Sequence, residues 1–186
     1  MRLIIGISGA SGVIMGERLL RELKRQNVET HLVITEGAMR TFALETTLDL
    51  AAVADLATAN YAPHDLGASI ASGTFAADGM IVMPCSMKTA AGIACGYADN
   101  LLLRAADVCI KEGRKIVLVP REMPLSPLHL KNLRKAAKLG CIVMPPMLTF
   151  YNGLDTLDGQ IRHIIGKVLG QFSLPCDGFR PWLGNA

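Results

Sequence analysis

The chain has 186 residues, of which 51% are hydrophobic and 19% charged, and its formal net charge at pH 7 is +3. This length is typical of one domain with a continuous core. The small net charge, without basic runs among aromatic residues, argues against nucleic acid as a partner. The charged residues are too few to cover the surface of a monomer of this size, so we expect a homo-oligomer.

Apolar runs and cysteines bear on the cellular setting. No apolar run approaches the ~20 residues that span a bilayer, and the first is interrupted at Gly6, too early for a signal peptide. The cysteines are scattered, odd in number and without Cys-x-x-Cys spacing. We expect all five to be reduced and mostly buried, in a cytoplasmic protein with no membrane partner: Cys85, Cys95, Cys109, Cys141 and Cys176.

Short runs rich in Ile, Val, Leu and Met alternate along the chain with segments of helical pattern. They predict buried strands at residues 2–7, 29–34, 79–84, 115–119 and 141–144. Helical periodicity is clearest in residues 161–169, whose apolar stripe is expected to pack on the sheet. This alternation is typical of the α/β class, here a three-layer αβα fold with a doubly wound parallel sheet of Rossmann or flavodoxin type. We expect a single domain over residues 1–186, in which 175–186 form an extended C-terminal arm.

The first predicted strand runs into the glycine-rich loop Gly6–Gly12, and a helical pattern follows. Glycines let the backbone approach a ligand, while the Ser8 and Ser11 hydroxyls and the amides at the start of a helix can bind an anion. The spacing is not Gly-x-Gly-x-x-Gly, and Thr35 rather than an acidic residue ends the second strand, which favours a mononucleotide over a dinucleotide. A merely tight turn between strand and helix is the alternative.

A second polar loop follows the third predicted strand. Pro84 is expected to end the strand ladder, and Ser86 and Thr89 stand where the N-cap hydroxyl and first-turn amides of a helix converge. The carboxyl ends of parallel strands share one edge, so this loop is predicted to lie beside the first one. A plain helix cap is the alternative. We interpret Cys85 as a core thiol rather than a nucleophile, because no histidine is near it in the sequence.

The following helix carries Arg104 and Lys111 on one face of an otherwise apolar segment. Two cations in such surroundings need anions. They either pair with acids such as Asp107 and Glu112 or hold a phosphate across an interface, and the sequence leaves both possibilities open.

The strand predicted at 115–119 is followed by Arg121 and Glu122 between two prolines. This pattern places an arginine and a carboxylate at the sheet edge where open α/β folds bind ligands. A surface turn with a solvated ion pair is the alternative. Further on, residues 145–151 supply Met and aromatic side chains that suit a flat ring or an isoprenoid, although core filling is the safer interpretation of any single one of them.

Taken together and in this order, these segments resemble the UbiX-type flavin prenyltransferases, including proteins once described as small subunits of phenolic-acid decarboxylases. The resemblance covers nearly the whole chain and rests on five motifs in register: Gly6–Gly12, Met83–Thr89, Arg104–Val108 with Lys111-Glu112, Pro120–Leu125, and Met144–Pro146 with Phe150-Tyr151. It implies a flavodoxin-like fold assembled from trimers into a dodecamer. It also implies transfer of the prenyl group of dimethylallyl phosphate to reduced FMN, closing a ring between N5 and C6, to make the cofactor of UbiD-type decarboxylases.

The resemblance further implies the residues of the site. FMN would be held by Gly9, Ala10, Ser11, Thr35, Ser86, Met87, Lys88, Thr89 and Arg121. The prenyl phosphate would be bound by Tyr151 and Lys167, with Arg104, Lys111, Glu122 and the tail residue Trp182 nearby and partly supplied by neighbouring subunits. Glu122 or Glu45 would serve as base and Ser11 as relay.

Two positions depart from the family pattern. Thr35 stands where serine is usual and keeps the hydroxyl, whereas Lys167 stands where arginine is expected and lacks the bidentate fork. No Asp, Glu or His cluster has metal-ligand spacing, so no metal is expected. Two rivals stay open: a flavin-dependent cysteine decarboxylase, although none of the four histidines has the setting of a catalytic one, and a flavin-binding accessory subunit of an aromatic-acid decarboxylase complex without catalysis of its own.

Overall fold

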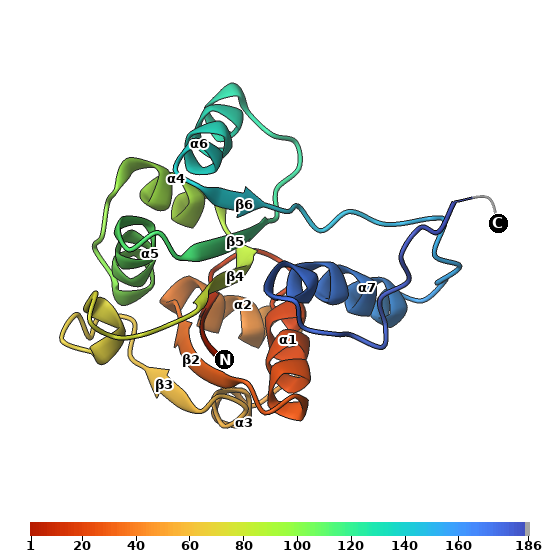
Figure 1. The fold of residues 1–186 in the computed structure, drawn as a ribbon, viewed down its shortest axis with the longest axis horizontal. Helices are drawn as coiled ribbons and strands as arrows, with labels where there is room; N and C mark the ends of the chain where they lie inside the picture. The colour runs from red at the N-terminus through yellow and green to blue at the C-terminus, as the bar shows by residue number, and fades with distance from the viewer. Residues whose placement is uncertain (185–186) are drawn as a thin grey trace. The chain divides into compact units, whose positions relative to one another are not determined.

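The computed structural model describes residues 1–184, and its N-terminal part is built on one sheet of parallel strands (Figure 1). The strands are β1 (Arg2–Ile7), β2 (Glu29–Ile34), β3 (Ala59–Tyr61), β4 (Gly79–Cys85), β5 (Lys115–Pro120) and β6 (Cys141–Val143). Their order in the sheet is β3-β2-β1-β4-β5-β6. Both neighbours of β1 pair with it in parallel, and Gly6 lies opposite Val33 on one side and Val82 on the other. The strand order therefore reverses between β1 and β4, which is where doubly wound sheets bind ligands at the carboxyl ends of the strands.

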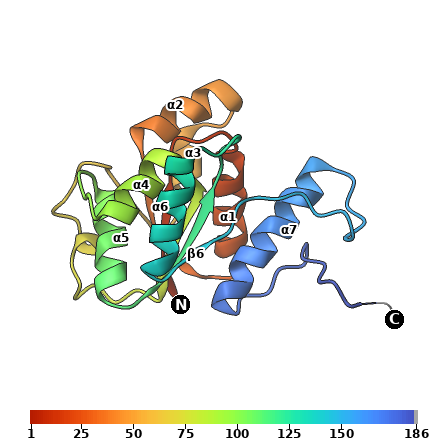
Figure 2. The same cartoon turned by 90° about the horizontal axis from the view of Figure 1, so that it is seen from above.

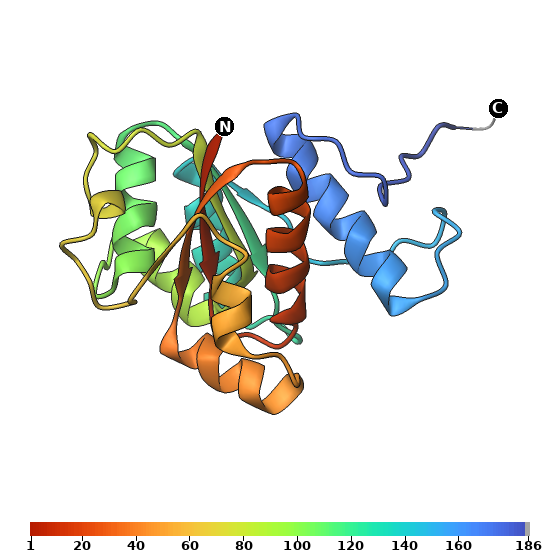
Figure 3. The same cartoon turned by 90° about the horizontal axis from the view of Figure 1, so that it is seen from below.

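Helices cover both faces of this sheet. The helices of this part are α1 (Ile14–Arg25), α2 (Glu36–Glu45), α3 (Leu50–Ala54), α4 (Met87–Cys95), α5 (Leu101–Lys111) and α6 (Pro127–Lys138). α1 lies on one face, and α4, α5 and α6 lie together on the other (Figure 2 and Figure 3). α2 follows β2 directly and lies at the end of the sheet toward which the strands run (Figure 3). The predicted αβα class with a doubly wound parallel sheet is confirmed.

Apolar side chains of the strands and helices pack together on the two faces of the sheet. In β1 the side chains of Leu3, Ile4 and Ile5 are fully buried, as expected of a central strand covered on both faces. On α1 the residues Leu19 and Leu23 are also fully buried, one helical turn apart, and this helix contacts β2 and β4. Each such side chain contributes about 1.5–3 kcal/mol when it leaves water, so the packing holds the loops at the carboxyl edge on a rigid base.

The chain from Pro146 onward forms a second compact unit. It contains α7 (Leu157–Leu169), a short 3₁₀ helix (Gly170–Phe172) and an irregular tail described as far as Gly184. α7 begins where the Thr156 hydroxyl accepts a hydrogen bond from the Gly159 amide at 3.1 Å, a typical N-cap. The apolar stripe is confirmed as a buried face, with Ile164 half-buried and the other members buried: Ile161, Ile165, Val168 and Leu169. Its packing on the sheet stays a prediction.

The structure corrects the sequence-based elements in several places: β5 ends at Pro120 and β6 at Val143, each one residue from the predicted bound, and two differences are larger. The strand Ala59–Tyr61 was not predicted, because it has three residues and an exposed asparagine in the middle. Pro84 does not end its strand. β4 continues to Cys85, which pairs with Pro120 after a shift of register. Among the described residues, no helix is both long and apolar enough to cross a membrane. The single domain over 1–186 with an arm from 175 stays a prediction, and residues 185 and 186 of that arm lie outside the described part.

Candidate functional site

A cavity of about 530 Å³ lies at the carboxyl edge of the sheet, within the N-terminal unit. It is lined by residues that follow β1, β2, β3, β4 and β5: Gly9, Thr35, Glu36, Gly37, Arg40, Pro63, His64, Ser86, Met87, Lys88, Thr89, Asp99, Asn100, Leu103 and Glu122. This volume is in the range of about 300–1,000 Å³ that is typical of small-molecule sites. The cavity therefore lies where the strand order predicts a ligand.

The loop after β1 makes its closest approach to the chain at the start of α2. A Cβ atom on Gly9 would lie 2.8 Å from the carbonyl carbon of Gly37 and 3.0 Å from its Cα. Only a residue without a side chain lets these two backbone segments come so close. Gly9 thus brings the glycine-rich loop and the N-terminus of α2 to the same wall of the cavity.

Thr35 caps α2 at that wall. Its Oγ1 accepts a hydrogen bond from the Ala38 amide at 3.2 Å, and the extended backbone of Thr35 precedes the helix. The first-turn amides of Glu36 and Gly37 have no carbonyl partner within the helix, so they are available to an anion. Thr35 therefore places its hydroxyl at the start of α2, on the wall of the cavity.

Ser86 caps α4 on the neighbouring wall. Its Oγ accepts from the Thr89 amide at 3.2 Å and donates to Thr89 Oγ1 at 3.1 Å, while its own amide donates to Ser8 Oγ at 2.7 Å. Ser8 in turn donates to the Pro84 carbonyl at 3.1 Å. This buried chain of hydrogen bonds ties the two loops together. Ser86 is thus a helix cap, which was one of the two interpretations of this loop. The first turn of α4, whose amides have no carbonyl partner within the helix, lines the same cavity as the first turn of α2.

Ser11 and Glu45 meet next to this wall. The Gly12 amide donates to Glu45 Oε2 at 2.8 Å, and the Ser11 hydroxyl also bonds to this carboxylate. Burial raises the pKa of Glu45, but the hydrogen bonds from Ser11 and from the Gly12 and Val13 amides outweigh it, and the pKa lies below its ordinary value. Glu45 is therefore ionised near neutral pH and fixes the Ser11 hydroxyl.

Arg121 and Glu122 leave β5 at the same edge. The Arg121 amide donates to the Cys85 carbonyl at 3.1 Å, which extends the pairing of β5 with β4 by one residue. Glu122 is exposed on the cavity wall and accepts a hydrogen bond from the Met123 amide at 3.1 Å. The alternative of an ion pair between Arg121 and Glu122 is not found in the described part of the chain. The positive charge of Arg121 acts on Glu45 instead and helps to lower its pKa.

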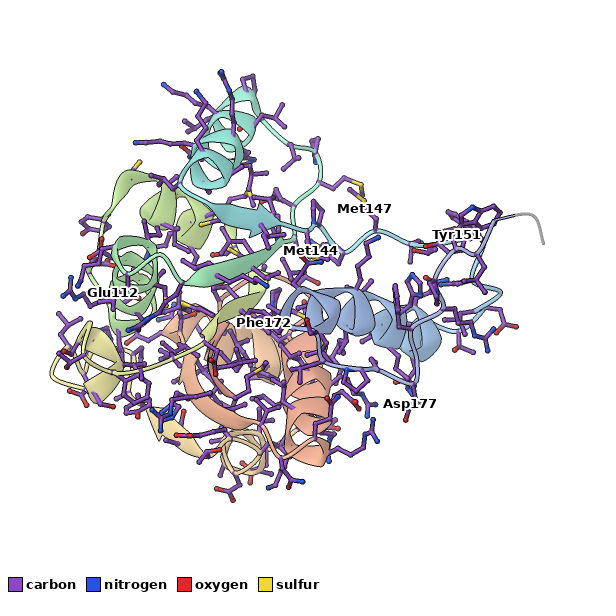
Figure 4. The ribbon with its side chains drawn as sticks, in the orientation of Figure 1. Glu112, Met144, Met147, Tyr151, Phe172 and Asp177 are labelled. Carbon is purple, nitrogen blue, oxygen red and sulfur yellow. The ribbon has the colours of Figure 1, made fainter. Side chains whose placement is uncertain are left out.

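Arg104 and Lys111 lie on α5 away from the cavity lining. Arg104 pairs with Asp107 at 2.8 Å and donates from Nε to the Ala71 carbonyl at 3.1 Å. Lys111 pairs with Glu112, which lies at the end of α5 (Figure 4). Within one chain, both cations thus have the acidic partners that the sequence offered as one of two possibilities. All four side chains are half-exposed, so these ion pairs hold little energy and can exchange for another anion.

Tyr151, Lys167 and Trp182 belong to the C-terminal unit. The rings of Tyr151 and Trp182 meet edge to face with centroids 5.3 Å apart (Figure 4 labels Tyr151). Tyr151 also meets the ring of His163 at 6.0 Å, and the Lys167 side chain is exposed on α7. These predicted substrate residues are thus gathered around α7.

The cavity has charged residues that the sequence-based prediction missed. His64 Nε2 lies 3.0 Å from Glu36 Oε1, and Arg40 lines the same cavity. His64 was not among the predicted site residues, and the structure places it on the cavity wall; that no histidine is catalytic stays a prediction. The hydrogen bond from His64, followed by its charge, lowers the pKa of Glu36. Glu36 could have been predicted as a site residue because it directly follows Thr35 in the sequence. His64 could not, because it follows the strand that was not predicted.

Ala10 and the cysteines are not among the residues that line the cavity. Ala10 is buried and its amide donates to the Ser8 carbonyl at 2.8 Å, so it shapes the loop without lining the cavity. Cys85 is fully buried and burial raises the pKa of its thiol, as a core residue requires. Cys109 and Cys141 are buried too, whereas Cys176 is half-buried and Cys95 is exposed. In residues 1–184, no three His, Cys, Asp or Glu side chains are grouped so that they could hold a metal ion.

Comparison with known proteins agrees with this geometry. A model of the flavoprotein family matches residues 1–169. A protein of Sedimentibacter hydroxybenzoicus named "Probable UbiX-like flavin prenyltransferase" is 58% identical over 186 residues, which cover 100% of this chain and 98% of that protein.

Two solved structures are similar throughout. The dodecameric FMN-dependent UbiX-like decarboxylase from Escherichia coli O157:H7 has a TM-score of 0.97 and 51% identity, with 99% of this chain and 100% of that chain covered. AnUbiX (PadA1), in complex with FMN and dimethylallyl pyrophosphate, has a TM-score of 0.97 and 40% identity, with 100% of this chain and 98% of that chain covered. The chain therefore belongs to the flavoprotein family and, within it, to the UbiX-like flavin prenyltransferases.

Proposed function

We propose that the protein transfers the dimethylallyl group of dimethylallyl phosphate to N5 and C6 of reduced FMN. The observation that carries this proposal is the meeting of two hydroxyl-capped helix N-termini, at Thr35 and Ser86, on one cavity at the strand-order reversal. Such amides favour a phosphate, and the reversal point is where α/β sheets bind mononucleotides. The membership of the chain in the UbiX-like family supports the choice of reaction.

The cavity fits FMN in size and in donors. Two sets of free first-turn amides, the Lys88 side chain and two hydroxyls converge on a volume of about 530 Å³. We assign FMN binding to Gly9, Ala10, Ser11, Thr35, Ser86, Met87, Lys88, Thr89 and Arg121. A dinucleotide such as FAD or NAD is disfavoured because the loop Gly6–Gly12 lacks Gly-x-Gly-x-x-Gly spacing and Thr35, not an acidic residue, follows β2.

In the proposed reaction the C–O bond of the prenyl donor breaks, inorganic phosphate leaves, and the allylic carbon bonds to N5 of reduced FMN, which loses its proton. The ring would then close when the prenyl double bond takes up a proton and its tertiary carbon bonds to C6, which loses a proton. The protein has to orient both substrates, neutralise the departing phosphate and move protons. Glu122 is exposed on the cavity wall and is free of a stabilising cation in the described chain, which suits a group that accepts a proton. Glu45 is held as an anion by its hydrogen bonds, which makes it a weaker base and a better anchor for Ser11.

The leaving phosphate needs cations and hydroxyl donors. We assign this role to Tyr151 and Lys167, with Trp182 beside the tyrosine ring. Arg104 and Lys111 would join them by exchanging Asp107 and Glu112 for the phosphate. The structure of AnUbiX with FMN and dimethylallyl pyrophosphate supports a prenyl phosphate as the second substrate, whereas the choice between phosphate and diphosphate is part of this proposal.

We infer that the functional form is a homo-oligomer in which neighbouring subunits complete each site. The apolar surplus of the sequence and the exposed side chains of Met123, Leu128 and Leu130 support an assembly. The similar Escherichia coli protein is dodecameric, and we propose a dodecamer here. The product would serve a UbiD-type decarboxylase, and the free thiols suit a reducing, cytoplasmic setting.

Mixing two inactive variants tests the function and the shared site together. Lys111→Ala and Tyr151→Phe proteins are each expected to form little prenylated flavin. After dissociation and reassembly as mixed oligomers, they should regain part of the wild-type rate, because some sites then receive both intact residues. Self-reassembled samples of each variant are the control. No recovery in mixed oligomers verified by mass would show that each chain carries a complete site.

A further inference from the structure

The tail after α7 folds back onto that helix, and His163 lies at the centre of the contact. His163 is 2% exposed, and the Phe179 ring lies against it with centroids 5.0 Å apart. The Arg180 amide donates a hydrogen bond to His163 Nδ1 at 3.3 Å. Gly166, one turn further along α7, has no side chain because a Cβ atom there would overlap Phe179. The tail is thus fitted closely to one face of α7.

The same histidine contacts the tyrosine assigned to the prenyl phosphate. The Tyr151 and His163 rings meet edge to face at 80°, and on its other side Tyr151 meets Trp182 at 70°. The tyrosine is 48% exposed, so its ring is supported by these two neighbours while part of it reaches solvent. Figure 4 shows Tyr151 where its loop and the tail come together. His163 therefore contacts Tyr151 directly and, through the tail, fixes Trp182 on the other side of that ring.

The backbone of the Tyr151 loop has separate anchors. Gln160 Nε2 donates to the carbonyls of Thr149 at 2.8 Å and Leu154 at 2.7 Å. Arg180 Nη1 donates to the Asn152 carbonyl at 3.0 Å. These bonds hold the course of the chain without His163, so what His163 adds is the orientation of the Tyr151 ring.

The hydrogen bond from the Arg180 amide also fixes the tautomer of the His163 ring. An amide N–H can donate only to an unprotonated nitrogen, so Nδ1 is the acceptor and a proton of the neutral ring resides on Nε2. Burial, followed by the charge of Lys167 one turn along the helix, lowers the pKa of His163 and favours this neutral form. His163 is thus kept as an acceptor next to a lysine that is itself assigned to the phosphate.

We propose that His163 is a positioning residue for the prenyl donor, because its neutral ring clasps the tail to α7 and thereby orients the Tyr151 hydroxyl. The proposal rests on the proposed function, in which Tyr151 binds the phosphate of that donor. Because His163 is 2% exposed, we place it behind Tyr151 and not in contact with either substrate. Its loss should therefore weaken donor binding, whereas FMN binding depends on the N-terminal unit and should be unaffected.

Replacement of His163 by leucine, which removes the acceptor at similar size, is the direct test. We expect the KM for dimethylallyl phosphate to rise about tenfold, which corresponds to loss of one hydrogen bond and one aromatic contact, with FMN affinity unchanged. His163→Asn places an amide oxygen close to the position of Nδ1 and should recover part of the wild-type KM. Ile165→Val, which removes one buried methyl group from the same helix, controls for plain destabilisation and should behave as wild type.

Trp182 gives a readout that needs no turnover. It is the single tryptophan of the chain, so tryptophan fluorescence reports on the surroundings of this one residue in the tail. The indole is already 62% exposed, so the informative quantity is the anisotropy of its emission: we expect it to fall in His163→Leu, where the ring loses its fixed surroundings, and to lie between this and wild type in His163→Asn. Unchanged anisotropy in His163→Leu overturns the proposal. An equal loss of FMN affinity and donor affinity overturns it too, because the histidine would then be merely structural.

The outcomes separate this proposal from the function on which it rests. A wild-type protein that forms no prenylated flavin refutes the proposed function. The emission anisotropy of Trp182 in the three variants then still tests whether His163 holds the tail on α7. An active wild type with an unchanged KM in His163→Leu refutes the positioning role and leaves the function standing. Should His163→Leu fail to fold, His163→Asn decides, because its KM and emission anisotropy must both differ from wild type.

Discussion

Replacing Gly9 by alanine tests the close approach on which the FMN cradle depends. The added Cβ atom would lie 2.8 Å from the Gly37 carbonyl carbon, 3.0 Å from its Cα and 3.1 Å from its oxygen, whereas ordinary contact begins at 3.4 Å. All three atoms belong to the backbone, so none can swing aside as a side chain would. The glycine-rich loop and the start of α2 would have to separate by about 0.6 Å.

The expected magnitude follows from two effects. Overpacking of this kind costs about 1–3 kcal/mol in the free energy of unfolding. The separation also moves the Thr35-capped amides of α2 away from the amides of α4, which are held in place by Ser8 and Ser86. Loss of about one charge-assisted hydrogen bond to the FMN phosphate, worth roughly 1.5–3 kcal/mol, raises the Kd for FMN about 10- to 100-fold.

Denaturant unfolding and titration of flavin fluorescence measure the two effects separately. Gly37→Ala is the matched control, because the nearest atom to its Cβ would be Gly9 Cα at an ordinary 3.4 Å, although Gly37 lines the same cavity. It should retain stability and bind FMN more tightly than Gly9→Ala does. Wild-type FMN affinity in Gly9→Ala would refute the account of the cradle, even if stability fell as expected.

The other predictions concern the chemical groups. Glu122→Gln should bind FMN as wild type does and lose product formation by about 100-fold or more, since a general base contributes 10²–10⁴-fold; unchanged turnover would return Glu122 to an ordinary surface residue. Lys167→Ala should raise the KM for dimethylallyl phosphate about tenfold and leave FMN binding alone, while Lys167→Arg keeps or improves donor binding; equal kinetics in all three proteins would show that the position is idle. The pKa of Glu45 is lowered in the fold, so its contribution to stability is present above its ordinary pKa and is lost as pH falls through the folded value. The free energy of unfolding should then fall less steeply with acid in Glu45→Gln, and parallel curves would contradict this.

The sheet could be predicted from the sequence wherever burial leaves a continuous apolar run. β1, for example, is buried on both faces, and every position from Leu3 to Ile7 is inaccessible to solvent. β3 was not predicted because an edge strand of three residues has no such run. His64, which follows β3 and lines the cavity, was therefore not predicted as a site residue either. The end of β4 was predicted one residue too early, because proline usually ends a strand ladder, whereas here the strand pairs again at Cys85 after a register shift.

The site was predictable as a set of loops but not as a set of contacts. Helix caps have local signatures, so Thr35 and Ser86 could be placed from residues near them in the sequence. Contacts between distant segments have no local signature, and the Glu45 carboxylate reaches the Gly12 amide across 33 positions. For the same reason the sequence could not decide between ion pairs and phosphate for Arg104, whose bond to the Ala71 carbonyl depends on tertiary structure.

The most direct test of the central claim is the mass of the flavin after reaction. The purified protein would be incubated anaerobically with reduced FMN and dimethylallyl phosphate, and the released flavin analysed by mass spectrometry, with Glu122→Gln and a sample without donor as controls. The account predicts that in the wild-type sample the flavin gains one prenyl group in place of one hydrogen, with release of an equal amount of inorganic phosphate, while Glu122→Gln forms about 100-fold less product and the sample without donor forms none. Unmodified FMN in a wild-type sample that demonstrably binds it would contradict the proposal that this protein is a prenyltransferase.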